Sequence, residues 1–346
     1  MPLAELLGVE QPLIQAPMAG VQGSSLAIAV SNAGGLGSLP CAMLTPAAMR
    51  TELETIRAST AQPFNVNFFV HRPPEPDPVG EARWRAALRP YYAELGLDAH
   101  DVPAGAGRLP FNDEAADVLE DLRPPVVSFH FGLPSPALLA RVRSLGATIL
   151  ASATTVDEGL LLEANGADAV IAQGIEAGGH RGMFLSSDLT TQIGTFALVP
   201  QLVKALTVPV IAAGGMATPG CVRAARALGA AGVQVGTAYL LCAEATTSSI
   251  HRSALRSDAA RHTALTNVFT GRPARGIVNR FIRECGPMSD LAPAFPLAGA
   301  AVAPLRVAAE EMGSGDFSPL WAGQHAPDPS DVSAAELTRK LCEISN

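Results

Sequence analysis

Residues 208–240 read VPVIAAGGMATPGCVRAARALGAAGVQVGTAYL, and this stretch contains one complete repeat of the fold. The continuous apolar run at its start is typical of a strand buried on both faces of a parallel sheet. The segment at 218–229 predicts a helix, because Thr218 is a favourable N-cap and Gly229 a favourable stop. A second apolar run follows at 232–240. The stretch therefore predicts a strand, a helix and the next parallel strand.

The same alternation of apolar runs and helical segments recurs along the rest of the chain. Further apolar runs of strand length lie at 13–20, 35–40, 64–70, 126–132, 148–153 and 169–174. Helical segments at 135–146 and 155–166 lie between some of them, each ending at a glycine. Strand and helix units that repeat to eight strands predict an α/β fold, the TIM (β/α)8 barrel. An open doubly wound sheet shows the same alternation and is the alternative.

Two segments do not fit this repeat. Residues 71–110 form a Pro-rich excursion between the third and fourth strands, and residues 243–310 follow the eighth strand with a helical character. Excursions on the C-terminal side of barrel strands usually shape substrate access. We therefore predict a barrel at 1–242 that includes the excursion, and an additional smaller helical or α+β substrate-covering domain at 243–310. A C-terminal tail at 311–346 is expected to pack back on the barrel.

The composition of the 346 residues excludes several classes of protein. Hydrophobic residues make up 48% of the chain and charged residues 16%, which supports a large core and argues against disorder. The net charge of -8 argues against a nucleic-acid partner, because phosphate contacts require clustered lysine and arginine.

The cysteines and the N-terminus indicate the compartment. The five cysteines are scattered without a CxxC pair, so we expect free thiols and no metal site. Neither a signal peptide nor an apolar run of about 18 residues is recognisable, so we expect no membrane association. The prediction is a cytoplasmic protein, a monomer or homodimer, that acts on a small molecule.

In a barrel, the active site lies at the C-terminal ends of the strands, so residues at these ends are the candidates. The candidates at the first, third, fourth and sixth strands are Ala16, Pro17, Met18, Asn67, His130 and Gln173. His130 stands between two phenylalanines and is either a core histidine or a site residue.

Two glycine turns follow the seventh and eighth strands, where barrels commonly hold a phosphate group. The first contains Gly214 and Gly215, and the second contains Gly236 and Thr237. Glycine allows backbone N–H groups to approach an anion, and the N-terminus of the following helix adds a favourable dipole. The turns therefore predict a phosphate site; glycines that only form tight turns are the alternative.

The stretch AQGIEAGGHRG at 172–182 combines an amide, a carboxylate, an imidazole and a guanidinium just after the sixth strand. His180 follows two glycines, so its side chain is expected outside the core. An imidazole titrates near neutrality and can act as an acid, a base or a cationic clamp. Arg181 is expected either to be structural or to pair with Glu176.

Together these residues resemble the nitronate monooxygenase family, formerly called 2-nitropropane dioxygenases, which bind FMN on a TIM barrel. The matching stretches are QAPMAG, GGLGSLP, NVNFF, SFHFG, AQGIEAGGHRG, PVIAAGG, GVQVGTAYL and PLWAGQ. The combination of SFHFG, AQGIEAGGHRG and the late WAGQ is specific for class I of this family. The resemblance implies oxidation of alkyl nitronates by O2 to carbonyl compounds and nitrite. Propionate 3-nitronate and nitroalkanes are possible substrates.

The resemblance also implies roles for individual residues. It implies that His180 is the catalytic base and that His130 lies near the substrate. The cofactor contacts that it implies are Ala16, Pro17 and Met18 beside the flavin ring, Asn67 and Gln173 on the ring or ribityl chain, Gly178, Gly179, Gly214, Gly215, Gly236 and Thr237 toward the phosphate end, and Gln324 from the tail.

One departure from the family concerns the substrate pocket. Relatives commonly carry tyrosines in the region that matches 294–304, which here reads AFPLAGAAVAP. Phe295 keeps the aromatic surface without the hydroxyl and is expected to contact the substrate. This departure bears on the range of substrates and not on the flavin site.

Other functions on a similar scaffold have to be weighed. An FMN-dependent NAD(P)H:quinone reductase or enoyl-acyl-carrier-protein reductase shares QAPM and the glycine turns, although EAGGHRG with SFHFG favours the monooxygenase. An inosine-monophosphate dehydrogenase would need a cysteine in the loop after the sixth strand, where the chain has QGIE. A barrel that only binds a phosphate-bearing ligand is the non-catalytic alternative.

Overall fold

The structure is a computed structural model that describes residues 2–99, 108–326 and 332–343. Its centre is an eight-stranded parallel sheet with the strand order β1-β9-β8-β6-β5-β4-β3-β2. The strands are β1 (Leu13–Gln15), β2 (Gly37–Pro40), β3 (Phe64–Phe69), β4 (Val126–His130), β5 (Thr148–Ala153), β6 (Ala169–Gln173), β8 (Val210–Ala213) and β9 (Gly232–Val235).

The two end strands of this sheet meet, which closes it into a barrel. Ile14 forms a parallel bridge with Leu36. The N–H of Gln15 donates to the carbonyl of Leu36 over 2.9 Å, and the N–H of Leu36 donates to the carbonyl of Leu13 over 2.8 Å. The predicted TIM-type α/β barrel is therefore confirmed, and the open doubly wound sheet is excluded.

The continuous apolar runs arise because both faces of each strand are buried. In β8, Ile211 belongs to a cluster that includes Leu3 and Leu7 of α1 (Leu3–Leu7), whereas Ala212 belongs to a cluster shared with the surrounding helices. Successive side chains of a strand point to opposite faces. Neither face of β8 meets water, so a polar residue at either position would be costly.

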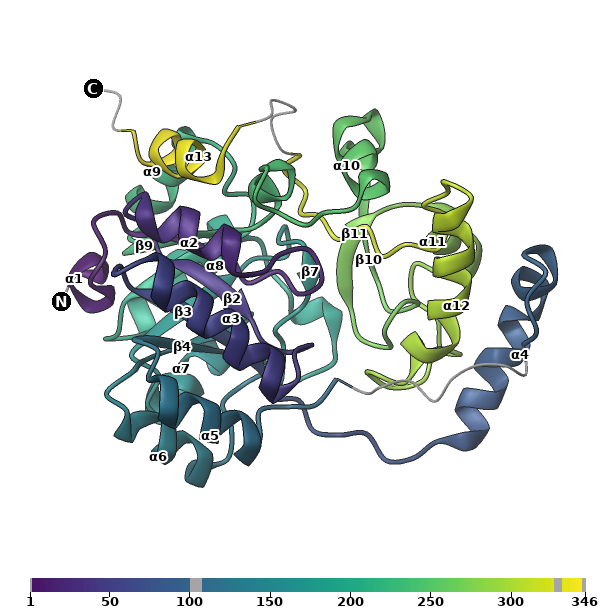
Figure 1. Cartoon of the computed structure of the whole chain (residues 1–346), viewed down its shortest axis with the longest axis horizontal. Coiled ribbons are helices and arrows are strands. Elements are labelled where there is room, and N and C mark those ends of the chain that lie inside the picture. The colour runs from purple at the N-terminus through teal and green to yellow at the C-terminus, as the bar shows by residue number, and fades with distance from the viewer. Residues whose placement is uncertain (1, 100–107, 327–331, 344–346) are drawn as a thin grey trace.

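Helices surround the barrel strands, as Figure 1 shows. They are α2 (Ser24–Asn32), α3 (Pro46–Ser59), α5 (Asp113–Leu122), α6 (Pro136–Ser144), α7 (Val156–Ala164), α8 (Thr195–Ala205) and α9 (Pro219–Ala227). The predicted N-cap of α9 is confirmed, because Thr218 accepts a hydrogen bond from the N–H of Cys221. The last helix, α13 (Ala334–Cys342), packs against α2 and α9.

A second group of elements lies beside the barrel (Figure 1). It contains a three-stranded antiparallel sheet with the order β10-β11-β7. Its strands are β7 (Gly179–His180), β10 (Thr263–Thr266) and β11 (Ala274–Ile277), and its helices are α4 (Pro78–Glu94), α11 (Arg280–Cys285) and α12 (Ala298–Glu311). Helix α10 (Ser249–Arg256) and the short 3-10 helices η1 (Leu189–Thr191), η2 (Thr237–Leu241) and η3 (Asp258–Arg261) complete the described elements.

The excursion between β3 and β4 packs against the segment that follows β9. Trp84 and Tyr92 of α4 are buried in one apolar cluster with Phe281 of α11. The Trp84 indole donates to the carbonyl of Ala298 over 3.2 Å, and the Tyr92 hydroxyl donates to that of Ala301 over 2.6 Å. Strands β10 and β11 lie within the segment 243–310, so this segment contains strands as well as the expected helices. The domain boundaries at 242 and 310 stay a prediction, and residues 100–107 lie outside the described ranges.

No helix within the described ranges is long and apolar enough to cross a membrane.

Arg181 fixes the loop that connects β6 to β7. Its side chain is completely buried. It donates to the carbonyls of Gln173 and Gly174 over 2.7 Å each and to Oε1 of Gln192 over 3.0 Å. Burial lowers the pKa of Arg181 to about 10. Of the two roles considered for Arg181, the structural one is therefore correct.

Replacing Arg181 by methionine tests this anchor. The substitution keeps an unbranched side chain but removes the Arg181 donors from the carbonyl of Gln173 and from Oε1 of Gln192. The carbonyl of Gly174 keeps the N–H of Ala177 as its donor. Each unsatisfied group costs about 1–3 kcal/mol, so the free energy of unfolding should fall by about 2–5 kcal/mol. Urea denaturation measures this change, with Arg89→Met at an exposed position of α4 as the control. An unchanged midpoint for Arg181→Met would show that other contacts hold the loop.

Candidate functional site

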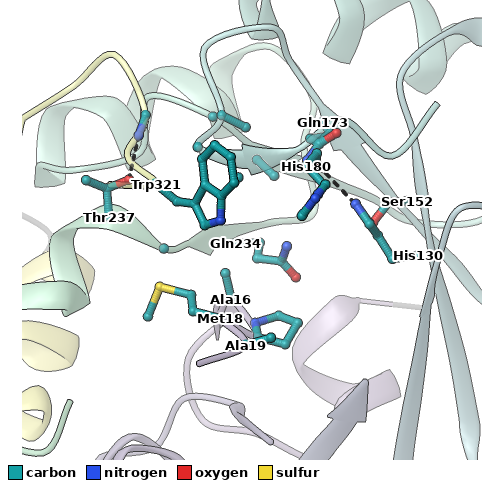
Figure 2. Close-up of a pocket in the computed structure, with 18 of the residues that line it drawn as sticks. Ala16, Met18, Ala19, His130, Ser152, Gln173, His180, Gln234, Thr237 and Trp321 are labelled. Carbon is teal, nitrogen blue, oxygen red and sulfur yellow. Dashed lines mark hydrogen bonds between the residues drawn. The ribbon is translucent and has the colours of Figure 1, made fainter. Parts of the chain in front are cut away.

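A cavity opens at the C-terminal ends of the barrel strands, where a TIM barrel carries its active site. Most of the predicted site residues line it: Ala16, Pro17, Met18, Asn67, His130, Gln173, Gly178, Gly179, His180, Gly214, Gly215, Gly236 and Thr237. Figure 2 shows Thr237 at one end of this cavity and His180 and His130 at the other, with Trp321 and Ala16 between them.

Two predicted site residues are not among the lining residues. Phe295 is buried, and its ring centroid lies 5.3 Å from that of His180, so it packs edge-to-face against the imidazole. Gln324 is exposed, and its backbone N–H donates to the carbonyl of Glu176 over 2.9 Å. Its neighbours Gly323 and His325 line the cavity in its place.

The side-chain amide of Gln173 holds both sides of the loop around His180. Its Nε2 donates to the carbonyl of His180 over 3.0 Å, and its Oε1 accepts from the N–H of Gly182 over 2.7 Å. Oε1 therefore already has a backbone donor. Gln173 thus holds the loop that carries His180 in addition to lining the cavity.

His130 contacts the same carbonyl. Its Nε2 lies 3.1 Å from the carbonyl oxygen of His180. Because a carbonyl can only accept, Nε2 must carry the proton, and Nδ1 is the unprotonated nitrogen. Burial lowers the pKa of His130 to about 3, so the ring is neutral at pH 7. His130 is therefore a partly buried site residue that positions the loop.

The His180 ring lies among aromatic side chains. Its centroid is 5.6 Å from that of Trp321 and 6.1 Å from that of Phe69. Its Nε2 lies 2.9 Å from the hydroxyl of Thr270, and its Nδ1 makes no hydrogen bond to a described residue. Burial lowers the pKa of His180 well below 6.5, and the positive charge of Arg108 lowers it further. A neutral imidazole with one available nitrogen has the state required of a base.

The opposite end of the cavity presents backbone N–H groups. Gly214 and Gly215 have φ of 116° and 75°, a conformation that favours glycine. The N–H groups of Gly215 and Thr237 donate to no acceptor within the described residues. Added at Gly236, a Cβ would lie 3.4 Å from Ala16. This end therefore offers unpaired donors to an anion.

The side chain of Glu176 does not reach the cavity as a free carboxylate. It accepts from the N–H and the hydroxyl of Thr195 over 2.8 Å each, so it joins the loop to the start of α8. Glu176 is therefore a structural residue. No cluster of three metal-ligating side chains occurs in the described part of the chain.

Sequence reasoning missed several lining residues, among them Arg108, Ser152, Gln234, His251, Trp321 and His325. Gln234 interrupts the apolar run GVQV of β9, and this interruption could have identified it. Trp321 is the first residue of the WAGQ stretch that contributes to the family resemblance. Arg108 stands at the end of the long excursion, where no periodicity predicts its position.

Known proteins similar to this chain agree on one family. The model of the family described as nitronate monooxygenase matches residues 1–343. The nitronate monooxygenase of Pseudomonas aeruginosa is 44% identical over 98% of this chain and 97% of its own length. That of Paraburkholderia phytofirmans is 41% identical over 98% of this chain and 93% of its own length.

Solved structures are similar to this chain over nearly its full length. The nitroalkane oxidase of Streptomyces ansochromogenes has a TM-score of 0.89 at 40% identity, covering 98% of this chain and 96% of that one. FabK from Thermotoga maritima is more distant, with a TM-score of 0.74 at 25% identity over 98% of this chain and 94% of that one. The family match and the curated relatives, both nearly full-length, leave one conclusion. The chain belongs to the nitronate monooxygenase family.

Proposed function

We propose that the protein is an FMN-dependent monooxygenase that oxidises alkyl nitronates with O2 to carbonyl compounds and nitrite. Its membership of the nitronate monooxygenase family supports nitronate oxidation. The observation that carries the proposal is that one cavity combines a neutral imidazole, His180, with a cradle of unpaired N–H groups at the other end. Such a cavity suits a phosphate-bearing cofactor beside a base.

The residues of the cavity fit FMN. The N–H groups of Gly215 and Thr237 would hold the phosphate, as backbone donors do at glycine turns of barrels. The Oε1 of Gln234 is buried in the cavity wall without a hydrogen-bond donor, and a ribityl hydroxyl would satisfy it. The isoalloxazine ring would lie between Trp321 and the backbone of Ala16 (Figure 2).

The other predicted cofactor contacts surround the same space. Asn67 and Gln173 line the cavity, and we propose that they contact the bound ring or ribityl chain. Pro17 and Met18 line the cavity next to Ala16. Gly178 and Gly179 line it from the loop that carries His180, and Gly214 lines it from the turn after β8. Gln324 does not line the cavity, its side chain is exposed and its N–H is paired with the carbonyl of Glu176, so its contact with the cofactor stays a prediction.

FMN, when bound, supplies the one-electron chemistry that transfers an electron from the nitronate to O2. The chain itself binds and orients the substrate. With a neutral nitroalkane, Nδ1 of His180 takes the α-proton, while Thr270 holds Nε2. The clamp of Gln173 and His130 on the His180 carbonyl keeps the ring at a fixed distance from the substrate.

Substrate range and cellular context complete the proposal. Propionate 3-nitronate and short nitroalkanes are the proposed substrates, and Phe295 shapes the pocket through its contact with His180. We further propose that the protein acts in the cytoplasm as a monomer or homodimer. The direct test is an assay with a purified alkyl nitronate in air, in which O2 uptake and nitrite release are measured together.

A reductase on the same barrel is the alternative, and the likeness to FabK at 25% identity is the observation that favours it. The likeness to the nitroalkane oxidase, at 40% identity, is stronger. An NAD(P)H:quinone or enoyl-acyl-carrier-protein reductase would reduce its flavin with NAD(P)H. The monooxygenase would do so with a nitronate.

The phosphate site is tested by Gly236→Val. The backbone of Gly236 has a negative φ, so the variant should fold, but its side chain would fill the space that the phosphate needs. We expect the purified variant to lose most of its FMN, measured by absorbance, with an unchanged far-UV circular dichroism spectrum. Gly236→Ala is the matched control and should retain more FMN than the valine variant. Full flavin content in Gly236→Val would contradict the assignment.

The role of His180 is tested by His180→Asn. We expect the rate with neutral nitroalkanes to fall by about a hundredfold or more, because a general base contributes on the order of a hundred- to ten-thousandfold. The fold loss of rate with preformed nitronates should be at least ten times smaller than that with nitroalkanes, because nitronates have already lost the α-proton. Steady-state rates with the two substrate types measure this ratio. Equal losses on both would make His180 a binding residue, and no loss on either would transfer the role to His130.

The pH profile provides an independent test of the same base. Because burial lowers the pKa of His180 below 6.5, its neutral form persists at pH values below that of an exposed histidine. We therefore expect kcat/KM for a neutral nitroalkane to stay constant as the pH falls through 6.5 and to decline only below it. A decline centred at or above pH 6.5 would show that His180 is not desolvated in the working enzyme.

A further inference from the structure

The wall of the cavity carries positive but no negative side chains. Among the described residues that line it there is no aspartate or glutamate, whereas Arg108 contributes a guanidinium. The Cζ of Arg108 lies 5.7 Å from the ring centroid of Phe295, and the His180 centroid lies 5.3 Å from the same point. The guanidinium and the imidazole therefore share Phe295 as a packing partner, and Arg108 and His180 line the same cavity.

Arg108 has no partner for its charge within the described residues. No described side chain or carbonyl accepts a hydrogen bond from its guanidinium, and no described carboxylate forms an ion pair with it; its ring contact with Phe295 is the interaction found. Its backbone is held by a hydrogen bond from His71. A partly buried guanidinium without a counter-charge is costly, and a bound anion would offset this cost.

The other arginines around His180 are engaged. Arg272 lies 3.9 Å above the ring of Phe131 and donates to the carbonyl of Met183. Arg275 donates to the carbonyl of Ile175 over 2.8 Å. Neither lines the cavity, and both are committed to packing or backbone contacts. Arg108 differs from them because it lines the cavity and its guanidinium donates to no acceptor among the described residues.

The histidines at this end do not supply the positive charge. Burial lowers the pKa of His71 to about 4 and that of His130 to about 3, and the pKa of His180 also lies well below 6.5. Protonation of any of them would add a charge beside Arg108 and Arg272. At neutral pH the positive charge at this end is therefore that of the arginines.

We propose that Arg108 binds the anionic nitro oxygens of the substrate and selects nitronates over uncharged ligands; this inference rests on the proposed function. A nitronate is planar and carries its negative charge on two oxygens. A guanidinium offers parallel N–H donors in one plane, so it can bind both oxygens at once. The same contact stabilises the charge that develops when His180 removes the α-proton of a neutral nitroalkane.

The assignment divides the work between the two side chains. His180 moves the proton, and Arg108 binds the anion. One imidazole could not perform both tasks at once. Its protonated form can bind the anion but cannot accept a proton, and its neutral form can accept a proton but has no charge to bind the anion. The separation explains why the pocket can use preformed nitronates as well as neutral nitroalkanes.

The test compares Arg108→Gln and Arg108→Lys in the flavin-loaded protein. For Arg108→Gln we expect KM for an alkyl nitronate to rise roughly tenfold to hundredfold, the range for loss of a charge-assisted hydrogen bond. KM for a neutral nitroalkane should change less than about twofold, with its loss confined to kcat. Arg108→Lys keeps the charge but not the planar fork, so its nitronate KM should lie between the two.

Binding of nitrate, a planar anion that does not react, provides a readout that is independent of turnover. Calorimetry should detect nitrate binding to the wild-type protein and its loss in Arg108→Gln. Arg89→Gln, at an exposed position of α4, changes the net charge equally and should bind nitrate normally. Unchanged nitronate KM and nitrate affinity in Arg108→Gln would overturn the proposal. Arg108-dependent nitrate binding without any nitronate turnover in the wild type would overturn the proposed function and leave Arg108 as an anion-binding residue.

Discussion

The carbonyl oxygen of His180 is the point on which the site depends. It accepts hydrogen bonds from Gln173 at the end of β6 and from His130 at the end of β4, so two barrel strands fix one peptide group. Through β7 the same residue pairs with Ala274 of β11 in the smaller sheet. The loop that carries His180 is thus held between the barrel and the elements beside it, and its imidazole is positioned from both sides.

The electrostatics of the cavity follow from this burial. Aromatic side chains around His180 exclude water, which penalises the charged form of each histidine. Arginines remain charged under the same conditions because their pKa is far higher. A site with a neutral imidazole and a permanent positive charge therefore arises without an aspartate or glutamate among the described residues that line it. Such a site suits a substrate that is itself an anion or that becomes an anion during the reaction.

The sequence predicts the barrel well and the site in part. The runs in β6 and β8 are apolar on both faces, and Thr218 caps α9 as expected. The alternation of strands and helices is therefore encoded in short stretches of the sequence. Gln173 and His180 could be identified because they stand at a strand end and in a distinctive loop. Arg108 and Phe295 reach His180 only through the packing of distant segments, which no local pattern encodes. For the same reason β10 and β11 were not predicted as strands.

The central claim is that a nitronate delivers electrons to the flavin in this cavity. The most direct measurement is anaerobic stopped-flow mixing of the purified, flavin-loaded protein with an alkyl nitronate and, separately, with NADH. The account predicts rapid loss of the oxidised flavin absorbance with the nitronate and little change with NADH over the same time. Rapid bleaching by NADH without a response to the nitronate would contradict it and identify a reductase.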